Sequence, residues 1–244
     1  MTDRIKTGIL GLDDLIKGGF KKGSINILAG PTGTFKTIVA SQYIFHGAKD
    51  FGEPGIYLTL EERAEGLKES LSSFNMNVDS LGEGKFHIVD LSYMRKKKPQ
   101  FGENKQRYNV SLDVLINTIK NLAGIYKIER LVVDSISVLW LLYKDQADMR
   151  DDLFIFTDFL REIGLTTLLI TEIEEEFKDT RVSRFGIEEF LADGVIVLGY
   201  TRSKGELRRW ISIRKMRFTD HNLDMHPIRL TDKGVEVVSS EKIY

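Results

Sequence analysis

The chain has no cysteine, only four prolines and only two tryptophans among its 244 residues. Without cysteine, neither a disulfide framework nor a thiolate metal site can form, and we expect a cytoplasmic location. An excess of either charge is also missing, since 35 basic residues stand against 36 acidic ones and the formal net charge is −1. A global attraction to nucleic acid or to a membrane surface is therefore excluded, and any such binding depends on local clusters.

Long hydrophobic runs are absent as well. The longest, residues 138–143 around Trp140, is far shorter than the ~20 apolar residues of a membrane-spanning helix, and we expect it to pack in the core or at a subunit interface. Residues 1–6 are polar and charged, unlike a signal peptide. Hydrophobic residues make up 42% of the chain, so we predict one domain over residues 1–244 and no membrane association.

Short apolar runs alternate with longer amphipathic ones, which predicts a mostly parallel sheet covered by helices on both faces. The expected strands are residues 24–29, 55–60, 86–91, 130–134 and 166–171, and the expected helices are residues 36–48, 64–74, 111–125 and 151–163. Residues 95–109 are expected to form an irregular loop. In the last quarter, residues 195–200, 206–216 and 228–238 have strand patterns without intervening helices, so we predict antiparallel strands that extend the sheet.

A glycine-rich segment follows the first long predicted strand and opens the next predicted helix. With the residue after it, this segment consists of Gly30, Pro31, Thr32, Gly33, Thr34, Phe35, Lys36, Thr37 and Ile38. Its context predicts a phosphate-binding loop, or Walker A motif, whose backbone N–H groups face the β- and γ-phosphates of a nucleotide. We expect Lys36 to neutralise phosphate charge and the Thr37 hydroxyl to coordinate Mg²⁺.

One residue of this loop departs from the usual pattern, in which glycine precedes the lysine. Here the residue is Phe35. If the position needs a positive φ, phenylalanine costs about 1–3 kcal/mol of backbone strain. If it needs a negative φ, the loop can keep its shape with the ring turned outward. The sequence leaves both conformations open, and with them a loop that hydrolyses ATP weakly or only holds it.

Two further strands end in carboxylates. Asp134 ends the strand at residues 130–134, and groups at the carboxyl ends of parallel strands face the crevice where ligands bind. We expect Asp134 to hold Mg²⁺ through water, the alternative being a helix cap. Glu61 and Glu62 follow the strand at residues 55–60, where a carboxylate can polarise the attacking water. Glu61 is the preferred choice with Glu62 as support, and an acidic helix start is the alternative.

The order of these motifs resembles that of a known family. Further segments carry the resemblance, namely residues 6–15 with Gly18, Gly19 and Phe20, residues 52–57 with Leu60, Glu61 and Glu62, residues 132–135, residues 193–196, and residues 215–217 with His221. Together they span nearly the whole chain, which resembles the KaiC-like branch of the RecA superfamily, in particular the single-domain, RadA-like ATPases of archaea. The resemblance implies a RecA-like P-loop NTPase core, ATP and Mg²⁺ as cofactors, and hydrolysis to ADP and phosphate.

The resemblance also implies an assembly. The family forms rings, usually hexamers, with ATP between subunits, and its pattern places Lys215 and Arg217 at the γ-phosphate of the neighbouring subunit. Because these residues lie two positions apart, a strand presents both on one side. An exposed basic strand face is the alternative. Phe218 follows where the family generally has glycine, and this departure puts the position of the two cations in question.

Local basic clusters keep other functions open. One cluster is Arg95, Lys96, Lys97, Lys98, Lys105 and Arg107, and the other is Arg202, Lys204, Arg208 and Arg209. They allow a recombinase paralogue that binds single-stranded nucleic acid, although solvated charged loops give the same pattern. Residues 174–184, which we expect to line a ring pore, begin with acidic residues and continue with basic ones, so they indicate neither binding nor exclusion of nucleic acid. Phe35 separately motivates a non-hydrolysing, ATP-dependent scaffold with a protein partner. An autokinase activity has no clear acceptor residue.

Overall fold

The computed structural model describes residues 3–92, 112–138, 146–173, 188–203 and 205–243. Its elements are β1 (Arg4–Ile5), α1 (Leu12–Leu15), β2 (Phe20–Lys21), β3 (Ile25–Gly30), α2 (Lys36–Asp50), β4 (Gly55–Thr59), α3 (Ala64–Ser72), the 3₁₀ helix η1 (Val78–Leu81), β5 (Phe86–Asp90), α4 (Leu112–Tyr126), β6 (Arg130–Asp134), α5 (Gln146–Glu162), β7 (Thr166–Glu172), α6 (Glu188–Leu191), β8 (Gly194–Ser203), β9 (Glu206–Met216), β10 (His226–Thr231) and β11 (Gly234–Val237). The expected loop at residues 95–109 with its basic cluster, the apolar run beyond residue 138, the expected pore segment and Lys204 lie outside the described residues.

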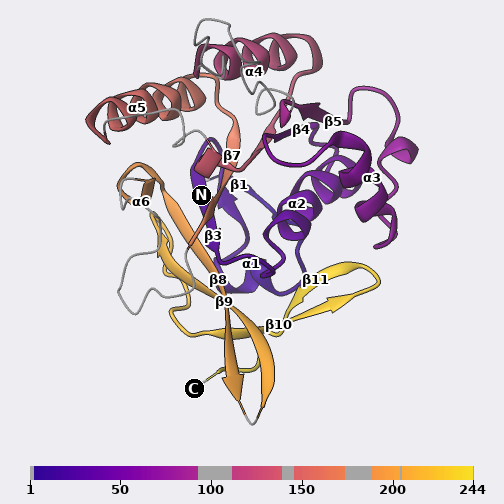
Figure 1. The fold of residues 1–244 in the computed structure, drawn as a ribbon, viewed down its shortest axis with the longest axis vertical. Helices are drawn as coiled ribbons and strands as arrows, with labels where there is room; N and C mark the ends of the chain where they lie inside the picture. The colour runs from indigo at the N-terminus through magenta and orange to yellow at the C-terminus, as the bar shows by residue number, and fades with distance from the viewer. Residues whose placement is uncertain (1–2, 93–111, 139–145, 174–187, 204, 244) are drawn as a thin grey trace, which may run out of the picture.

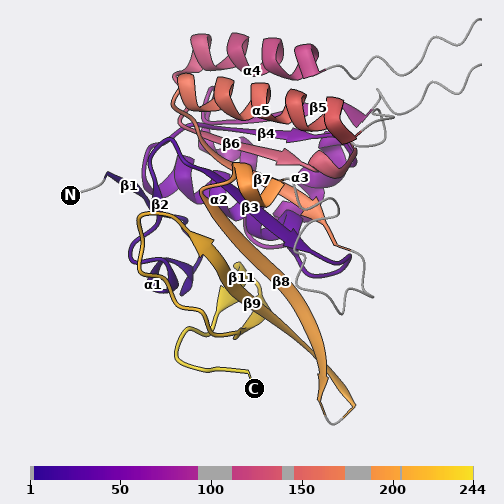
Figure 2. The same ribbon diagram turned by 90° about the vertical axis from the view of Figure 1, so that its left-hand side faces the viewer.

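Within the described ranges, the central feature is a nine-stranded sheet in the order β11-β10-β9-β8-β3-β7-β6-β4-β5 (Figure 1). Strands β8, β3, β7, β6, β4 and β5 run parallel, and β9, β10 and β11 extend the sheet in antiparallel fashion. Helices α4 and α5 cover one face and α2 lies on the other (Figure 2). The predicted fold class is confirmed. None of the helices in the described part of the chain could cross a membrane, because none is both long and apolar enough.

The central strands send alternate side chains into two separate cores. In β3, Ile27 packs in the core beneath α4 and α5, whereas Leu28 packs in the core beneath α2. In β4, Ile56 and Leu58 enter the first core and Tyr57 the second. Successive strand residues point to opposite faces, so a strand that is apolar at every position must be covered on both sides. This is the physical reason why near-continuous apolar runs predicted the parallel strands.

Two strand predictions are wrong in detail. The strand expected at residues 195–200 belongs to β8, which pairs in parallel with β3 and antiparallel only with β9. The single strand expected at residues 228–238 is instead the hairpin of β10 and β11. Gly234, which opens β11, has a φ of +100°, and a Cβ there would lie 2.6 Å from the Gln42 side chain. A close approach to α2 therefore requires glycine where the chain reverses.

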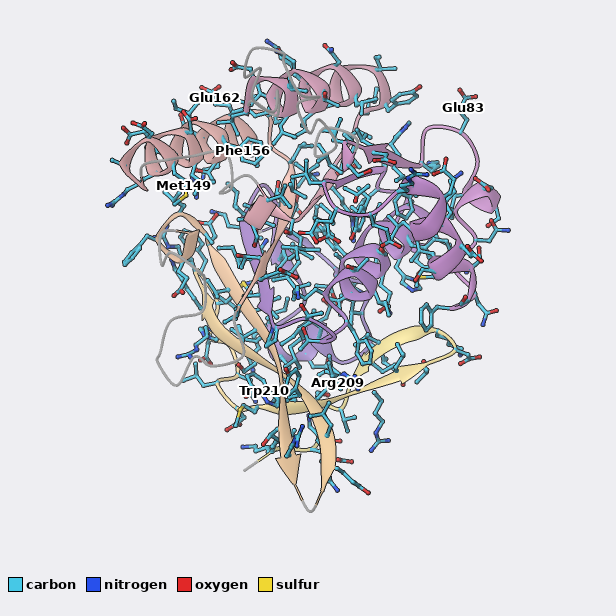
Figure 3. The ribbon with its side chains drawn as sticks, in the orientation of Figure 1. Glu83, Met149, Phe156, Glu162, Arg209 and Trp210 are labelled. Atoms are coloured by element: carbon cyan, nitrogen blue, oxygen red, sulfur yellow. The ribbon has the colours of Figure 1, made fainter. Side chains whose placement is uncertain are left out.

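One helix prediction is also wrong at its start. Helix α5 begins at Gln146 instead of residue 151. Met149 and Leu153 lie one helical turn apart and are both buried in the core, so the apolar stripe begins before the predicted boundary. The labelled Met149 and Phe156 side chains in Figure 3 belong to this stripe.

A fully buried arginine joins the start of β6 to α2 and to the N-terminal segment. Arg130 is 0% exposed, and its Nε donates to the Glu53 carboxylate at 2.7 Å. Its terminal nitrogens donate to Glu53 and to the backbone carbonyl oxygens of Tyr43 (2.7 Å) and Lys6 (2.8 Å). Gly47 of α2 makes room for the guanidinium, since a Cβ there would lie 2.4 Å from Arg130 Cδ. The buried charge is thus fully partnered.

Replacing Glu53 with alanine is expected to lower the free energy of unfolding by about 3 kcal/mol, because it leaves the buried guanidinium of Arg130 without its counter-charge. This is the lower end for such pairs, since Arg130 keeps two carbonyl acceptors. Urea unfolding followed by circular dichroism measures the loss. The matched control is Glu129→Ala, which removes an exposed ion pair to Lys22 and should cost less than about 1 kcal/mol. Equal losses in both variants would contradict this account.

Candidate functional site

The carboxyl ends of four neighbouring strands meet at one edge of the sheet. Gly30 at the end of β3 lies opposite Glu172 at the end of β7, and Thr59 at the end of β4 lies opposite Asp134 at the end of β6. A cavity of about 270 Å³ opens between these ends and the start of α2. Its lining residues are Thr32, Gly33, Thr34, Phe35, Lys36, Thr37, Ile38, Glu61, Asp134, Ser135 and Glu172. The structure therefore brings together nearly all residues that the sequence assigned to nucleotide and metal binding.

The loop between β3 and α2 has a defined local structure. The Thr34 hydroxyl is buried and donates to the Pro31 carbonyl oxygen at 2.7 Å, which holds the turn closed. Gly30 has no room for a side chain, because a Cβ there would lie 2.7 Å from both Leu198 O and Thr34 Oγ1. Helix α2 has no side-chain N-cap, so its first N–H groups are available to an anion at the cavity.

Lys36, the first residue of α2, folds back over this loop. It is 8% exposed, and its Nζ donates to the carbonyl oxygens of Gly30 (2.8 Å) and Pro31 (2.9 Å). Burial lowers the pKa of Lys36, and the nearby carboxylates of Glu172 and Asp134 oppose that shift. The Lys36 ammonium lies beside the loop N–H groups that would bind a phosphate. It can therefore move from the two carbonyl oxygens to a phosphate group with little rearrangement.

Asp134 and Thr37 form an oxygen pair beside the lysine. The Thr37 hydroxyl donates to Asp134 Oδ2 at 3.1 Å, and the Tyr57 hydroxyl donates to the same oxygen at 2.5 Å. Burial raises the pKa of Asp134 to about 6 despite these hydrogen bonds. A hydroxyl and a carboxylate at this spacing match the oxygen ligands that Mg²⁺ takes, and a divalent cation would relieve the burial of the charge.

The two adjacent glutamates have different surroundings. Glu61 lines the cavity and accepts a hydrogen bond from the Ser135 hydroxyl at 2.5 Å. Glu62 instead closes a tight turn, in which its backbone N–H donates to Thr59 Oγ1 and its carbonyl accepts from the same hydroxyl. Its side chain lies toward Gly66 in α3, 3.1 Å from where a Cβ would stand, and burial raises its pKa. Of the two, only Glu61 faces the cavity.

Sequence reasoning missed two residues of this cavity. Glu172 follows directly after the strand predicted at residues 166–171, and Ser135 enters the sequence analysis only as part of the segment 132–135, without a role. The Glu172 backbone N–H donates to the Ser137 hydroxyl oxygen at 2.9 Å. A polar residue at the end of a predicted parallel strand is the signal that could have found Glu172. The sequence does not show that β7 pairs with β3, and this pairing is what brings Glu172 to the cavity.

Phe35 settles the conformation that the sequence left open. It is the N-cap of α2 and has a φ of +71° and a ψ of +22°, in the left-handed region that favours glycine. Its ring is partly buried against the core, and the Arg209 guanidinium carbon lies 4.3 Å from the ring centroid. The loop therefore keeps the glycine-type backbone and bears the strain of a bulky residue.

Lys215 and Arg217 lie at the opposite edge of the sheet from this cavity. Met216 pairs with Gly194, and Gly194 pairs with Asn26 near the start of β3, whereas the phosphate loop follows the end of that strand. About 13 Å of strand separates the two edges. Lys215 Nζ donates to the Glu189 carbonyl oxygen at 2.9 Å, and Arg217 forms a 3.5 Å ion pair with Asp193. The two cations thus do not reach the cavity of their own chain.

Phe218, the second departure from the family pattern, also has a positive φ, of +61°. Its ring is 65% exposed, and Lys21 Nζ lies 4.0 Å from the ring centroid. The chain after Arg217 therefore takes the left-handed conformation that glycine favours.

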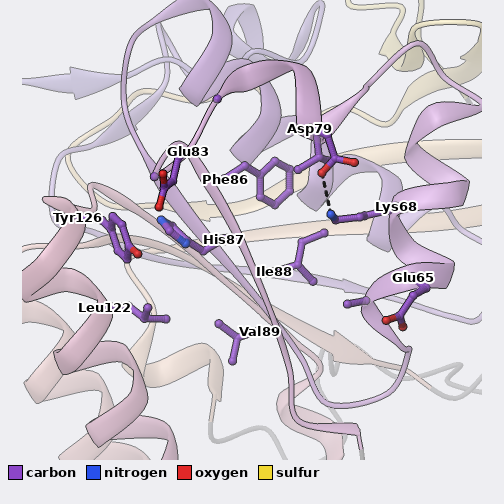
Figure 4. A pocket seen from close by; sticks show the side chains of 14 residues that line it. Glu65, Lys68, Asp79, Glu83, Phe86, His87, Ile88, Val89, Leu122 and Tyr126 are labelled. Carbon is purple, nitrogen blue, oxygen red and sulfur yellow. Dashed lines mark hydrogen bonds and ion pairs between the residues drawn. The ribbon is translucent and has the colours of Figure 1, made fainter.

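Larger hollows lie elsewhere on the described residues, and two of them bear on the assignment of the cavity. The first, of about 650 Å³, lies along the edge strand β5, where Figure 4 shows Lys68, Asp79 and His87 among its lining side chains. This hollow contains neither Lys36 nor the carboxylates of Glu61 and Asp134, so its larger size does not make it the nucleotide site. The second, of about 720 Å³, shares Phe35 with the cavity and is lined by four arginines, Arg202, Arg208, Arg209 and Arg229. It continues the cavity on the far side of Phe35.

The parallel sheet, the loop before α2 and the carboxylates at the strand ends define an ATP-binding domain of the RecA type. Residues 5–242 match the family described as "ATPase: KaiC", and the chain belongs to this KaiC-like family of ATPases. A solved structure of a KaiC-like protein from the hyperthermophilic archaeon Pyrococcus horikoshii OT3 is 37% identical to the chain, with a TM-score of 0.83. That match covers 97% of this chain and 99% of the other.

Curated relatives agree with this assignment. The circadian clock protein KaiC3 of Synechocystis is 34% identical over 97% of the chain, and the circadian clock oscillator protein KaiC of Nostoc is 31% identical over 96%. The chain spans only 46% and 44% of these two proteins. The similarity therefore covers an ATPase domain of these relatives, and the circadian role belongs to the relatives.

Proposed function

We propose that this chain, as one ATPase domain over residues 1–244, hydrolyses ATP to ADP and phosphate with Mg²⁺. The observation that carries the proposal is the cavity in which Lys36, Thr37, Asp134 and Glu61 converge at the start of α2. Lys36 and the loop N–H groups hold the β- and γ-phosphates. The Thr37 hydroxyl, and Asp134 through water, would hold the Mg²⁺, which would neutralise the charge that develops on the phosphates.

Glu61 carries the proton transfer in this proposal. Its carboxylate faces the cavity, and the Ser135 hydroxyl holds one of its oxygens at 2.5 Å, which leaves the other oxygen for a water molecule. The water oxygen attacks the γ-phosphorus, the bond to the β,γ-bridging oxygen breaks, and the water's proton passes to Glu61. ADP and phosphate are the products.

We further propose that the active form is a homo-oligomer, a ring of six subunits, in which Lys215 and Arg217 serve the neighbour's nucleotide. Their distance from the phosphate loop of their own chain supports this arrangement. Two exposed apolar side chains lie near them: Phe218, which is 65% exposed, follows Arg217, and Phe190, which is 75% exposed, follows Glu189, whose carbonyl oxygen Lys215 contacts. A subunit contact would cover these rings and bring a second phosphate loop to the cations.

A second candidate function is an ATP-holding scaffold that turns over little or no nucleotide and recruits a protein partner. The strained backbone of Phe35 favours it, because the strain persists at the residue before the phosphate-binding lysine. Parallel measurements of ATP binding and phosphate release separate the two functions. Hydrolysis by the unaltered protein supports the ATPase, whereas binding without release, with release restored in Phe35→Gly, supports the scaffold.

Binding of single-stranded nucleic acid is not favoured by the described basic residues. Arg208 pairs with Glu206 at 3.6 Å, and Arg209 donates to the Gly33 carbonyl oxygen at 2.9 Å. Arg208 thus has an acidic partner and Arg209 is tied to the phosphate loop through its Nε, so the two do not form a continuous basic surface for a nucleic-acid backbone.

The lysine test of the proposed site is direct. Lys36→Ala is expected to weaken MgATP binding by at least about 30-fold, since it removes a charge-assisted contact to phosphate. Isothermal titration calorimetry with MgATP measures the change. The matched control is Lys22→Ala, whose Nζ pairs with Glu129 at the other edge of the sheet. Unchanged affinity in Lys36→Ala, or an equal loss in the control, would remove the phosphate loop from the proposal.

A further inference from the structure

Phe35 and Arg209 make a contact between the phosphate loop and β9. The Arg209 Nε donates to the Gly33 carbonyl oxygen at 2.9 Å, and the guanidinium lies over the Phe35 ring at 4.3 Å. Arg209 thus holds the loop at two successive points, a backbone oxygen and an aromatic face. Figure 3 shows Arg209 beside Trp210 on this strand, and the two side chains point to opposite sides of it.

The arginine is not committed to an acidic partner. Among the described residues no carboxylate lies within ion-pair distance of Arg209, although Arg208 has Glu206 and Arg229 has Glu241. Its Nε donates to the Gly33 carbonyl oxygen, and among the described residues its terminal nitrogens have no hydrogen-bond acceptor. Arg209 lines the basic hollow beside Phe35, and Phe35 also lines the phosphate cavity. The free terminal nitrogens of Arg209 can therefore bind an anion near the phosphate loop.

The aromatic ring explains why the arginine stays in place. A long side chain without a counter-charge loses much of its rotamer freedom when it is fixed, and a cation–π contact offsets that cost. The ring can lie under the guanidinium only because residue 35 takes the left-handed conformation and turns its side chain toward β9. Glycine at this position would give the same backbone without the ring.

We propose that Phe35 is a positioning residue that fixes Arg209 over the phosphate loop, and that the pair forms a latch which slows the release of bound nucleotide. The anion that the latch retains is a nucleoside di- or triphosphate, so the proposal rests on the proposed nucleotide site. The latch opens when the Arg209 side chain leaves the Phe35 ring and the Gly33 carbonyl oxygen. The left-handed backbone of Phe35 thus serves nucleotide retention, because it presents the ring to Arg209.

The test separates the ring from the backbone. Asparagine tolerates the left-handed region but has no aromatic face, so Phe35→Asn removes the latch contact and keeps the turn, whereas Phe35→Tyr keeps the ring. Release of a fluorescent ADP analogue, chased with unlabelled ADP in a stopped-flow instrument, is expected to be about three- to tenfold faster in Phe35→Asn and in Arg209→Gln. Phe35→Tyr is expected to release the analogue at the rate of the unaltered protein.

The double variant decides whether the two residues act together. Phe35→Asn with Arg209→Gln is expected to release the analogue no faster than the faster single variant, since each removes the same contact. Multiplicative rates in the double variant, or an unaltered rate in Phe35→Asn, would overturn the latch.

A second measurement needs no nucleotide and therefore distinguishes failure of the latch from failure of the proposed function. Hydrogen exchange of the backbone amides in residues 32–37 is expected to be faster in Phe35→Asn than in Phe35→Tyr, because the loop is no longer tied to β9. If the unaltered protein fails to bind the analogue but shows this difference, the proposed function falls and the tie between loop and strand stands. Equal exchange in the two variants would overturn the latch whatever the protein binds.

Discussion

Replacing Glu61 with glutamine is expected to lower kcat for ATP hydrolysis by at least about 100-fold while MgATP binding stays within about twofold. The amide keeps the shape of the side chain and can still accept from the Ser135 hydroxyl, but it cannot take the proton of the attacking water. Steady-state phosphate release gives kcat, and calorimetry gives the affinity. A loss in kcat without a loss in binding is the sign of a group that acts in the transition state.

The neighbouring glutamate provides the matched control. Glu62→Gln changes the same chemical group one residue away, but that side chain lies toward Gly66 and outside the cavity. Its effect on kcat is expected to be much smaller than that of Glu61→Gln. Undiminished hydrolysis in Glu61→Gln, or a larger loss in Glu62→Gln, would show that the assignment of the base is wrong.

Replacing Arg217 with alanine is expected to lower kcat by about 1,000-fold or more, with little change in nucleotide binding to the phosphate loop. The reason is that Arg217 lies at the far edge of the sheet from its own phosphate loop and, in the proposed ring, serves the nucleotide of the neighbouring subunit. Lys215→Ala is expected to act in the same direction. Phosphate release at a protein concentration that keeps the oligomer intact measures both variants.

Mixing variants tests whether the contact runs between subunits. Lys36→Ala subunits lack a working phosphate loop but retain Arg217, and Arg217→Ala subunits have the reverse defect. In a randomly mixed ring about one quarter of the sites join an intact loop to an intact arginine, so activity should return to about one quarter of the unaltered value. The control is a mixture of Arg217→Ala with the double variant, which has no complete site. If the first mixture stays as inactive as its control, despite verified subunit exchange, the arrangement between subunits is wrong.

Much of the fold could be predicted because local pattern and tertiary environment agree. Near-continuous apolar runs such as residues 130–134 can be buried on both faces only in a parallel sheet with helices on each side. The boundaries that failed are those where distant contacts decide. Helix α5 extends back to Gln146, and the last predicted strand is a hairpin whose Gly234 lies close to Gln42 of α2.

The sequence by itself determined the chemistry of the phosphate loop, because the order of glycines, Lys36 and Thr37 between a strand and a helix is a local property. It also placed Asp134 and Glu61 at strand ends. Only the tertiary structure decided which strand ends are neighbours, and so brought Glu172 and Ser135 to the cavity and separated Glu61 from Glu62. Sheet order depends on pairing between segments far apart in the chain, which the local pattern does not specify.

The backbone at Phe35 was equally beyond the reach of the sequence. Its ring contact depends on Arg209, which lies 174 positions later on a strand that packs beside the loop only after folding, and the sequence left the sign of its φ open. The distance of Lys215 and Arg217 from their own phosphate loop likewise follows from the antiparallel pairing of β9 with β8. A residue's type is set by the sequence, whereas its partners are set by which strands pair, and the function proposed for this chain depends on both.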